Sequence, residues 1–253
     1  MGAMSSAPRL FVTSRLIPGE QTLLDEGQGK YLTRVMRLNE GDEVRCFDGQ
    51  SGEWRCHIRL LPGKKVAVEP DTQTREQVEA LDLTLLFAPL KKARTDFVVE
   101  KASELGVRLI QPVMTERTQS SRVRGDRLQA VVIEAAEQTE RLDIPEVADD
   151  VTLMAALDQW DRAKPLYYCD EAGDARPMAE AVAAQTTQSA GLLIGPEGGF
   201  SPNERKILRG LDFVVPVTLG PRILRAETAV VSALTLWQSL VGDWRSAPYL
   251  PSS

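Results

Sequence analysis

The pattern of hydrophobic and polar positions changes character near residue 75. Before it, short runs of mixed apolar and polar residues are bounded by turn residues, which predicts β-strands. These runs are RLFVT at 9–13, DEVRCFD at 42–48, EWRCHIRLL at 53–61 and KKVAVEP at 64–70. Between the first two, GKYLTRVMRL at 29–38 has Tyr31, Val35 and Leu38 at helical spacing, which predicts a helix. We therefore expect a small β-rich domain over residues 1–75.

A polar stretch without periodicity at 70–80 is interpreted as a linker, and after it strands alternate with helices. The continuous apolar run at 81–89 is typical of a strand that is buried on both faces. Further strands are expected at 107–114, 165–171, 190–195 and 213–220, and helices at 92–106, 125–140, 151–160, 177–185, 202–210 and 226–243. This alternation predicts an α/β domain with a mainly parallel sheet over residues 76–253.

The composition is that of a globular protein, with 43% hydrophobic and 26% charged residues. No apolar run approaches the length of a membrane span or forms the core of a signal peptide, so a cytoplasmic protein is expected. The cysteines Cys46, Cys56 and Cys169 lack metal-ligand spacing, and an odd number of them suits a reducing compartment. His57 is the one histidine and lies in a strand-like run, so no metal site is predicted.

The formal net charge of −6 argues weakly against nucleic-acid binding. Residues 1–76 contain as many basic as acidic residues, so the whole excess of acidic residues falls on the rest of the chain. Any basic surface that binds a polyanion must therefore be local.

The segment LLIGPEGGFSPNE at 192–204 leads from a predicted strand into a predicted helix through three glycines and a proline within six residues. Glycines let a ligand approach the backbone, or permit a positive φ. Ligands of open α/β sheets bind beyond the carboxyl ends of the strands, where this loop lies. The alternative interpretation is a tight strand-to-helix turn without a ligand.

A second loop, LGPRILRAETA at 219–229, follows the next predicted strand. Arg222 and Arg225 come just before an apolar helix, where positive charge opposes the helix dipole. This arrangement favours a functional role over a merely solvated helix start. Glycine-rich phosphate-binding motifs of the P-loop and dinucleotide types are missing, and the first loop carries only the acidic Glu197. The two loops therefore suit a ligand that is held by backbone groups, such as an adenosine-bearing molecule without phosphates.

These two loops, together with VEKASELGVRLIQPVMTERTQ at 99–119 and EAAEQTER at 134–141, resemble the family of 16S ribosomal RNA uridine N3-methyltransferases in the SPOUT superfamily. The β-rich start is similar to that family's PUA-like RNA-binding domain, so the resemblance covers nearly the whole chain. It implies a C-terminal trefoil-knotted α/β domain with a small N-terminal PUA-like β-barrel. It also implies a homodimer, S-adenosylmethionine as cofactor, and methylation of a uridine at N3 in the decoding region of the small ribosomal subunit.

The resemblance further implies a set of site residues. The adenine would lie against the backbone of Leu193, Gly195, Gly199, Leu219 and Leu224. The remaining cofactor-binding residues would be Glu197, Gly198, Gly220, Arg225, Thr228 and Ala229.

Methylation at N3 requires removal of the imide proton and stabilisation of the negative charge on the two flanking oxygens. Arg225 could supply charge-assisted hydrogen bonds to a carbonyl oxygen. Glu197 or Glu227 could accept the proton, directly or through water. Glu197 could equally hold the loop or a partner subunit, so the identity of the base is left open.

RNA contacts are expected at local basic clusters. Lys30, Arg34 and Arg37 would form one stripe on the predicted helix, with Arg9 before the first strand. A second cluster in a predicted loop comprises Arg117, Arg122, Arg124 and Arg127, and Lys91, Lys92 and Arg94 could extend it. Such charge runs are commonly just solvated faces.

A base that is modified on its pairing edge must be unpaired or flipped, and Phe200 would either stack on it or belong to the core.

Two alternatives of different kinds remain from the sequence. One is another SPOUT enzyme that acts on tRNA or on a ribose 2′-hydroxyl. The other is a noncatalytic RNA-binding or ribosome-assembly protein, which loss of Arg225 or of the loop glycines would favour; all of these are present.

Overall fold

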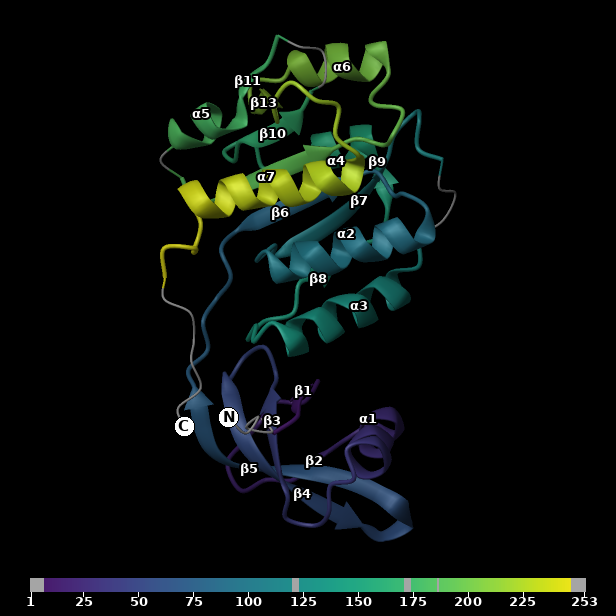
Figure 1. Cartoon of the computed structure of the whole chain (residues 1–253), viewed down its shortest axis with the longest axis vertical. Coiled ribbons are helices and arrows are strands. Elements are labelled where there is room, and N and C mark those ends of the chain that lie inside the picture. Colours follow the sequence, from purple (N-terminus) through teal and green to yellow (C-terminus); the bar gives the residue numbers. More distant parts are fainter. Residues whose placement is uncertain (1–6, 120–122, 171–173, 186, 247–253) are drawn as a thin grey trace. The chain divides into compact units, whose positions relative to one another are not determined.

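A computed structural model describes residues 7–119, 123–170, 174–185 and 187–246 (Figure 1). The chain divides into two compact units. The N-terminal unit comprises the chain up to Glu79 together with the segment Ala136–Ile144. The C-terminal unit comprises Ala80–Ala135 and the chain from Pro145 onward. None of the helices in the described ranges combines the length and the apolar character that a membrane crossing needs.

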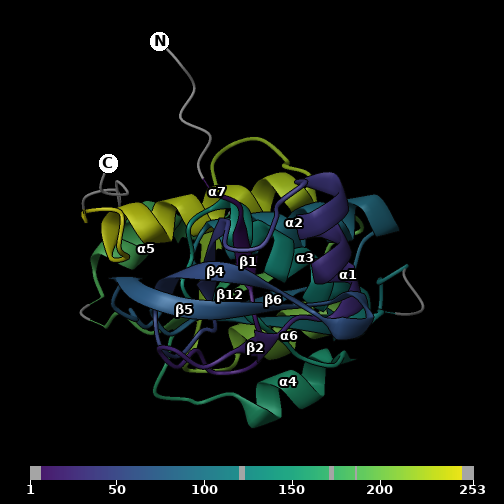
Figure 2. The ribbon, with the colours of Figure 1, turned by 90° about the horizontal axis from the view of Figure 1, so that it is seen from below.

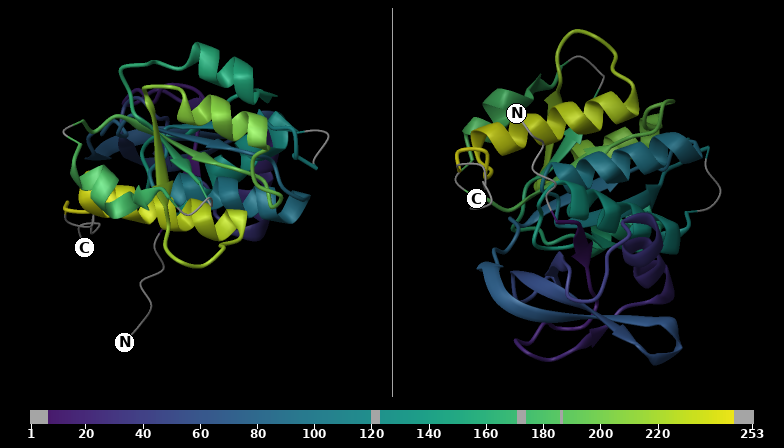
Figure 3. Two further views of the ribbon diagram at one scale, coloured as in Figure 1. Left: turned by 90° about the horizontal axis from the view of Figure 1, so that it is seen from above. Right: turned by 60° about the horizontal axis from the view of Figure 1, so that its bottom comes forward.

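The N-terminal unit contains a five-stranded sheet in the order β1-β3-β4-β5-β2. Its strands are β1 (Arg9–Phe11), β2 (Thr22–Leu23), β3 (Glu43–Phe47), β4 (Glu53–Leu61) and β5 (Lys65–Arg75). β1 runs parallel to β3 and the other neighbours are antiparallel. The sheet curves strongly around an apolar core that includes Leu10, Val44 and Ile58 (Figure 3). The four predicted strands are confirmed, whereas β2 was not predicted.

The predicted linker at 70–80 is partly wrong, because β5 continues to Arg75. Hydrogen bonding to β4 holds this polar stretch in the sheet, with Arg75 opposite Glu53. Backbone groups form hydrogen bonds between strands whether the side chains are polar or apolar. The hydrophobic pattern therefore does not predict such an extension of a strand. No regular structure is assigned to 76–82 apart from a bend at Asp82.

The predicted helix at 29–38 is shifted in the structure. It begins as α1 (Glu26–Lys30), which is capped reciprocally by Asp25 and Gln28, and continues as a π-helical segment, Tyr31–Val35. The wider π-helical turn changes which side chains face the sheet. Leu32 is fully buried, while Tyr31 and Val35, which the sequence placed on the apolar face, are 41% and 67% exposed.

The C-terminal unit contains an eight-stranded parallel sheet in the order β11-β13-β10-β12-β6-β7-β8, with β9 paired to β7. Its longer strands are β6 (Leu83–Phe87), β7 (Leu109–Met114), β10 (Leu166–Cys169), β12 (Ala190–Ile194) and β13 (Val214–Thr218). The two-residue strands, which were not predicted, are β8 (Glu146–Val147), β9 (Val151–Thr152) and β11 (Arg176–Pro177). Every residue of β6 and β12 is buried, which the continuous apolar run at 81–89 predicted for β6.

The helices of this unit are α2 (Lys92–Glu104), α3 (Gly125–Gln138, of which the last three residues belong to the N-terminal unit), α4 (Leu153–Gln159), α5 (Met178–Ala183), α6 (Pro202–Arg209) and α7 (Ala226–Leu240). α2, α3, α5 and α7 cover one face of the sheet, and α4 and α6 cover the other (Figures 1 and 2). Gly106 follows α2 with a φ of 79°, and Ser201 caps α6. All six predicted helices are confirmed. Since the strands are parallel, the loops that follow β6, β12 and β13 leave the sheet at the same edge.

Candidate active site

The glycine loop after β12 is shaped by its own packing. A Cβ on Gly195 would lie 2.6 Å from Cε2 of Phe200, which is buried directly beneath the loop. Gly199 adopts a φ of 65° and its N–H donates to the carbonyl oxygen of Pro196 at 2.8 Å. Phe200 is 3% exposed and packs edge-on against Tyr168, with ring centroids 5.1 Å apart, so it belongs to the core. Gly195 is therefore required by Phe200, and not only by close approach of a ligand.

The second loop follows β13 and ends at the start of α7. Gly220 adopts a φ of 108°, which only glycine tolerates well. Arg225 occupies the N-cap position of α7, but its side chain makes no capping hydrogen bond. Ile223 is 85% exposed, a high value for a large apolar side chain.

The two loops and the end of β10 surround a cavity of about 460 Å³. Of the predicted cofactor-binding residues, those on its wall are Gly195, Glu197, Gly199, Leu219, Gly220, Leu224 and Ala229. The sequence missed a third contribution to the wall. It comes from Tyr168, Cys169 and Asp170 at the end of β10, and from Arg205 on α6. The rule that ligands bind beyond strand ends would have included the end of β10 had its place beside β12 been known.

Four predicted cofactor-binding residues do not line the cavity. Leu193 is fully buried in the core and its strand pairs with neighbours on both sides. The carbonyl of Gly198 accepts a hydrogen bond from Nη1 of Arg117 at 2.8 Å. Arg225 and Thr228 are exposed in the first turn of α7 and lie outside the wall.

The two candidate proton acceptors are joined by Arg94 in the first turn of α2. Nη1 of Arg94 lies 3.2 Å from Oε1 of Glu197, and Nε lies 3.7 Å from Oε1 of Glu227. The sequence offered Arg94 only as an extension of the RNA-binding surface. Within the described ranges the Arg225 side chain has no hydrogen-bond or ion-pair partner, so its guanidinium is available to a ligand.

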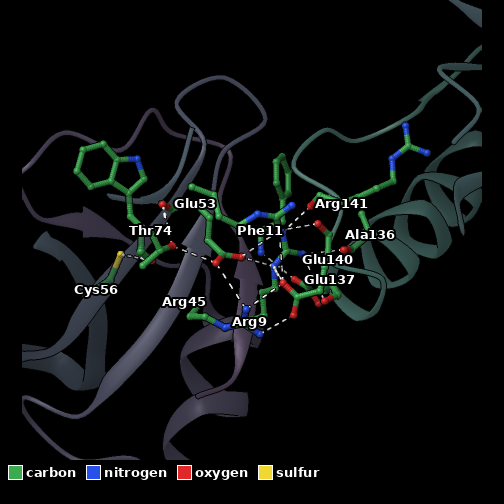
Figure 4. Close-up of polar contacts among 12 residues, drawn as sticks. Arg9, Phe11, Arg45, Glu53, Cys56, Thr74, Ala136, Glu137, Glu140 and Arg141 are labelled. Carbon is green, nitrogen blue, oxygen red and sulfur yellow. Dashed lines mark hydrogen bonds and ion pairs between the residues drawn. The ribbon is translucent and has the colours of Figure 1, made fainter. Parts of the chain in front are cut away.

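Arg9 was predicted to bind RNA, and the structure shows that this is wrong. Its side chain is buried, with Nε 2.6 Å from Oε2 of Glu53 and Nη1 donating to the carbonyl of Ala136 at 2.7 Å (Figure 4). The guanidinium also lies over the ring of Phe47, 3.9 Å from its centroid. Burial lowers the pKa of Arg9, although Glu53 opposes this effect. Arg9 is thus an internal structural charge that no phosphate can reach.

Lys30, Arg34, Arg37, Arg117 and Arg124 are exposed, whereas Arg127 is only partly exposed and pairs with Asp96. Lys30 pairs with Glu26 one turn earlier, so the expected stripe is not free of acidic residues. Arg37 follows the helix end with a φ of 58° and so leaves the stripe. Arg124 pairs with Asp126 at 2.7 Å, and Arg117 reaches the glycine loop. Arg122 lies outside the described residues.

Fold and cavity together define the class of protein. Residues 77–238 match the sequence model of the RNA methyltransferase domain, and residues 24–71 match that of the RNA methyltransferase PUA domain. The chain is therefore an RNA methyltransferase with a SPOUT-type α/β domain and a PUA-like N-terminal domain.

Comparisons with individual proteins show which family of RNA methyltransferases the chain belongs to. The ribosomal RNA small subunit methyltransferase E of Synechocystis is 34% identical over 93% of this chain and 78% of its own length. The enzyme of the same name from Neisseria gonorrhoeae, solved bound to S-adenosylmethionine, is 29% identical with a TM-score of 0.79, covering 94% of this chain and 99% of that one. A protein from Legionella pneumophila, solved in complex with the bound cofactor SAM, is 28% identical with a TM-score of 0.80, covering 92% of this chain and 97% of that one. The chain belongs to the ribosomal RNA small subunit methyltransferase E family, and the predicted family is confirmed.

Within the described ranges, no group of three or more histidine, cysteine, aspartate or glutamate residues is arranged to hold a metal ion. Cys46, Cys56 and Cys169 form no disulfide within the described ranges, and the first two are buried in the core of the N-terminal unit.

Proposed function

We propose that this protein methylates N3 of a uridine in the decoding region of 16S ribosomal RNA, with S-adenosylmethionine as the methyl donor. The observation that carries the proposal is the cavity between the two loops, with the Arg94–Glu197 ion pair at its wall. The names of the relatives support a small-subunit RNA substrate, and two similar structures contain the cofactor.

The cavity fits S-adenosylmethionine. Its volume of about 460 Å³ is within the range that small-molecule sites occupy. Ile194, Leu219 and Leu224 offer an apolar wall for an adenine ring, next to backbone that the loop glycines leave bare. Arg205 offers a positive charge for the carboxylate of the amino-acid part, and the buried carboxylate of Asp170, which pairs with Arg209, belongs to the same wall. Bound there, the cofactor supplies a methyl group on a sulfonium, whose sulfur keeps the electron pair of the broken bond.

The residues of the chain would have two tasks at the uracil ring. A carboxylate, Glu197 or Glu227, removes the N3 proton. Arg225 donates hydrogen bonds to a ring oxygen on which negative charge develops, and it is free to do so because no residue in the described ranges binds its side chain.

The proposed function is tested by incubating the protein with labelled S-adenosylmethionine and small subunits that lack the modification, and then separating the nucleosides. Label in 3-methyluridine supports the proposal. Label in another base or in a 2′-O-methylated ribose would instead show a different SPOUT reaction. Cofactor binding without any labelled nucleoside would favour a noncatalytic ribosome-assembly role.

Arg225→Ala is expected to lower kcat by about 100-fold to 1,000-fold, because it removes a donor that acts on developing charge. The dissociation constant for S-adenosylmethionine should change by less than about 3-fold, since the Arg225 side chain is outside the cavity wall. Arg162→Ala, at an exposed arginine outside the cavity, serves as the control. A loss of cofactor affinity with unchanged kcat would contradict this role.

Arg117→Ala is expected to weaken cofactor binding by about 3-fold to 10-fold, the effect of losing one hydrogen bond of about 1 kcal/mol. Its guanidinium holds the carbonyl of Gly198 and so stabilises the glycine loop. Calorimetric titration with S-adenosylmethionine, without RNA, measures the effect. If Arg117 acts only on RNA phosphates, the cofactor titration will be unchanged while RNA affinity falls.

We also propose the features of assembly that the family resemblance implied. These are a cytoplasmic homodimer, a trefoil knot in the C-terminal part, a PUA-like RNA-binding domain over 1–75 and a methyltransferase domain over 76–253. RNA would bind along Lys30, Arg34, Arg37, Arg117 and Arg124. Light scattering measures whether the protein is a dimer, and limited proteolysis locates the domain boundary. The role of the basic residues is tested by measuring how charge-reversal variants bind to small subunits.

A further inference from the structure

The two carboxylates that could accept the proton differ in their access to the cavity. The Glu197 side chain is 37% exposed and lines the cavity. The Glu227 side chain is 16% exposed, does not line the cavity, and has its Oε2 sealed from solvent without a hydrogen-bond partner. A proton acceptor must come within hydrogen-bond reach of the proton, directly or through one water. Access to the cavity therefore favours Glu197 over Glu227 as the proton acceptor.

The backbone on both sides of Glu197 is held in place. The hydrogen bond from the N–H of Gly199 to the carbonyl of Pro196 closes a turn around Glu197. Arg117 holds the carbonyl of the next residue, Gly198. A base that is fixed in this way needs no reorganisation when the substrate arrives, which favours proton transfer.

Arg94 orients the carboxylate itself. It binds Oε1 of Glu197 at 3.2 Å, and Oε2 has no partner within the described ranges. One oxygen is thus held and the other is left for a proton. The same guanidinium, 3.7 Å from Glu227, is the countercharge that lets two carboxylates lie close together.

The helix that carries Arg94 does not itself require this charge. The first turn of α2 contains no acidic residue, and Lys92 and Arg94 lie where positive charge opposes the helix dipole. The favourable partners of Arg94 are the two glutamates.

From these observations, and resting on the function proposed above, we infer that Glu197 is the proton acceptor, that Arg94 is its positioning residue, and that Glu227 anchors Arg94. The N3 proton moves to Oε2 of Glu197, and the electron pair of the N–H bond stays on N3. That pair forms the new bond to the methyl carbon. Because Glu197 is partly exposed, it then returns the proton to solvent.

The test is the single-turnover rate with saturating cofactor and unmodified small subunits. Glu197→Gln is expected to lower the rate by about 100-fold or more, the usual effect of removing a general base. Glu227→Gln and Arg94→Ala should each lower it by about 10-fold, and Arg94→Lys should recover most of the loss. The double variant Arg94→Ala/Glu227→Gln should be no slower than Arg94→Ala, since both changes break one arrangement. Glu180→Gln and Arg162→Ala, both exposed and outside the cavity, are matched controls.

The pH profile separates a base from a structural residue. Without its base, Glu197→Gln should accelerate by about tenfold per pH unit in mildly alkaline solution, because hydroxide then removes the imide proton. Within the described ranges the charged groups next to Glu197 include Arg94, Glu227 beyond it, and Arg117 at the carbonyl of the adjacent Gly198. A Glu197→Gln profile parallel to that of the wild type, or a larger loss in Glu227→Gln than in Glu197→Gln, overturns the inference. If the wild-type protein forms no 3-methyluridine, the proposed function is overturned. If the wild-type protein forms 3-methyluridine and Glu197→Gln is fully active, only the inference about Glu197 is overturned.

Discussion

Glu53→Gln is expected to lower the free energy of unfolding of the N-terminal unit by about 3–5 kcal/mol, the usual cost of removing one partner from a buried ion pair. The Glu53 side chain is 1% exposed and faces three arginines. Its carboxylate oxygens lie 2.6 Å from Arg9, 3.5 Å from Arg45 and 4.0 Å from Arg75. Glutamine keeps the shape but removes the charge, which leaves the buried Arg9 without its nearest counterion.

Urea denaturation of the full chain, followed by the fluorescence of Trp54 on β4, measures this change. Single-tryptophan variants, in which Trp160, Trp237 and Trp244 are replaced by phenylalanine, isolate that signal. Glu43→Gln is the matched control, because Glu43 is exposed on the neighbouring strand β3. A loss below about 1 kcal/mol would mean that Glu140, which also pairs with Arg9 and Arg45, is sufficient as the countercharge.

Gly195→Ala is expected to weaken S-adenosylmethionine binding by about 10-fold to 100-fold and to lower stability by about 1–3 kcal/mol, as overpacking commonly does. The added Cβ would lie 2.6 Å from Cε2 and 3.0 Å from Cδ2 of Phe200. That ring cannot move aside, because it is buried against Tyr168. The loop must shift instead, and with it the wall of the cavity.

Gly198→Ala provides the comparison within the same loop. Its Cβ would meet Arg117 at 3.6 Å, an ordinary contact, so we expect a change in cofactor affinity of less than about 3-fold. Phe200→Leu in the Gly195→Ala background should restore part of the affinity by making room. Equal effects of the two alanine variants in the titration would argue that a ligand, and not Phe200, requires the glycine at 195.

Local signals predicted much of the C-terminal unit. The continuous apolar run of β6 and the alternation of strands with helices each rest on residues that are close together in the sequence. Their structural consequences are therefore encoded next to one another in the chain. The glycine loops were also located correctly, since a buried strand followed by glycines marks the end of a parallel strand.

The N-terminal helix shows where local signals fail. Its apolar residues were assigned to a face with ordinary α-helical spacing, but the π-helical turn at Tyr31–Val35 moves that face to Leu32. A change of helical type rests on how the segment packs on the sheet, where Gly29 meets Val66. Periodicity alone does not contain that information.

The sequence by itself therefore determined the family, the order of the elements and the two loops that form most of the cavity. Only the tertiary structure decided the partners of the charges. Arg9 pairs with Glu53, which is 44 positions away in the sequence, so this predicted RNA contact is a charge inside the core. Arg94 pairs with Glu197, which is 103 positions away, so this predicted RNA contact lies next to the candidate active site. The physical reason is that the sequence around an arginine does not reveal whether its side chain is solvated or paired. Its role is decided by which carboxylate the folded backbone brings within about 4 Å.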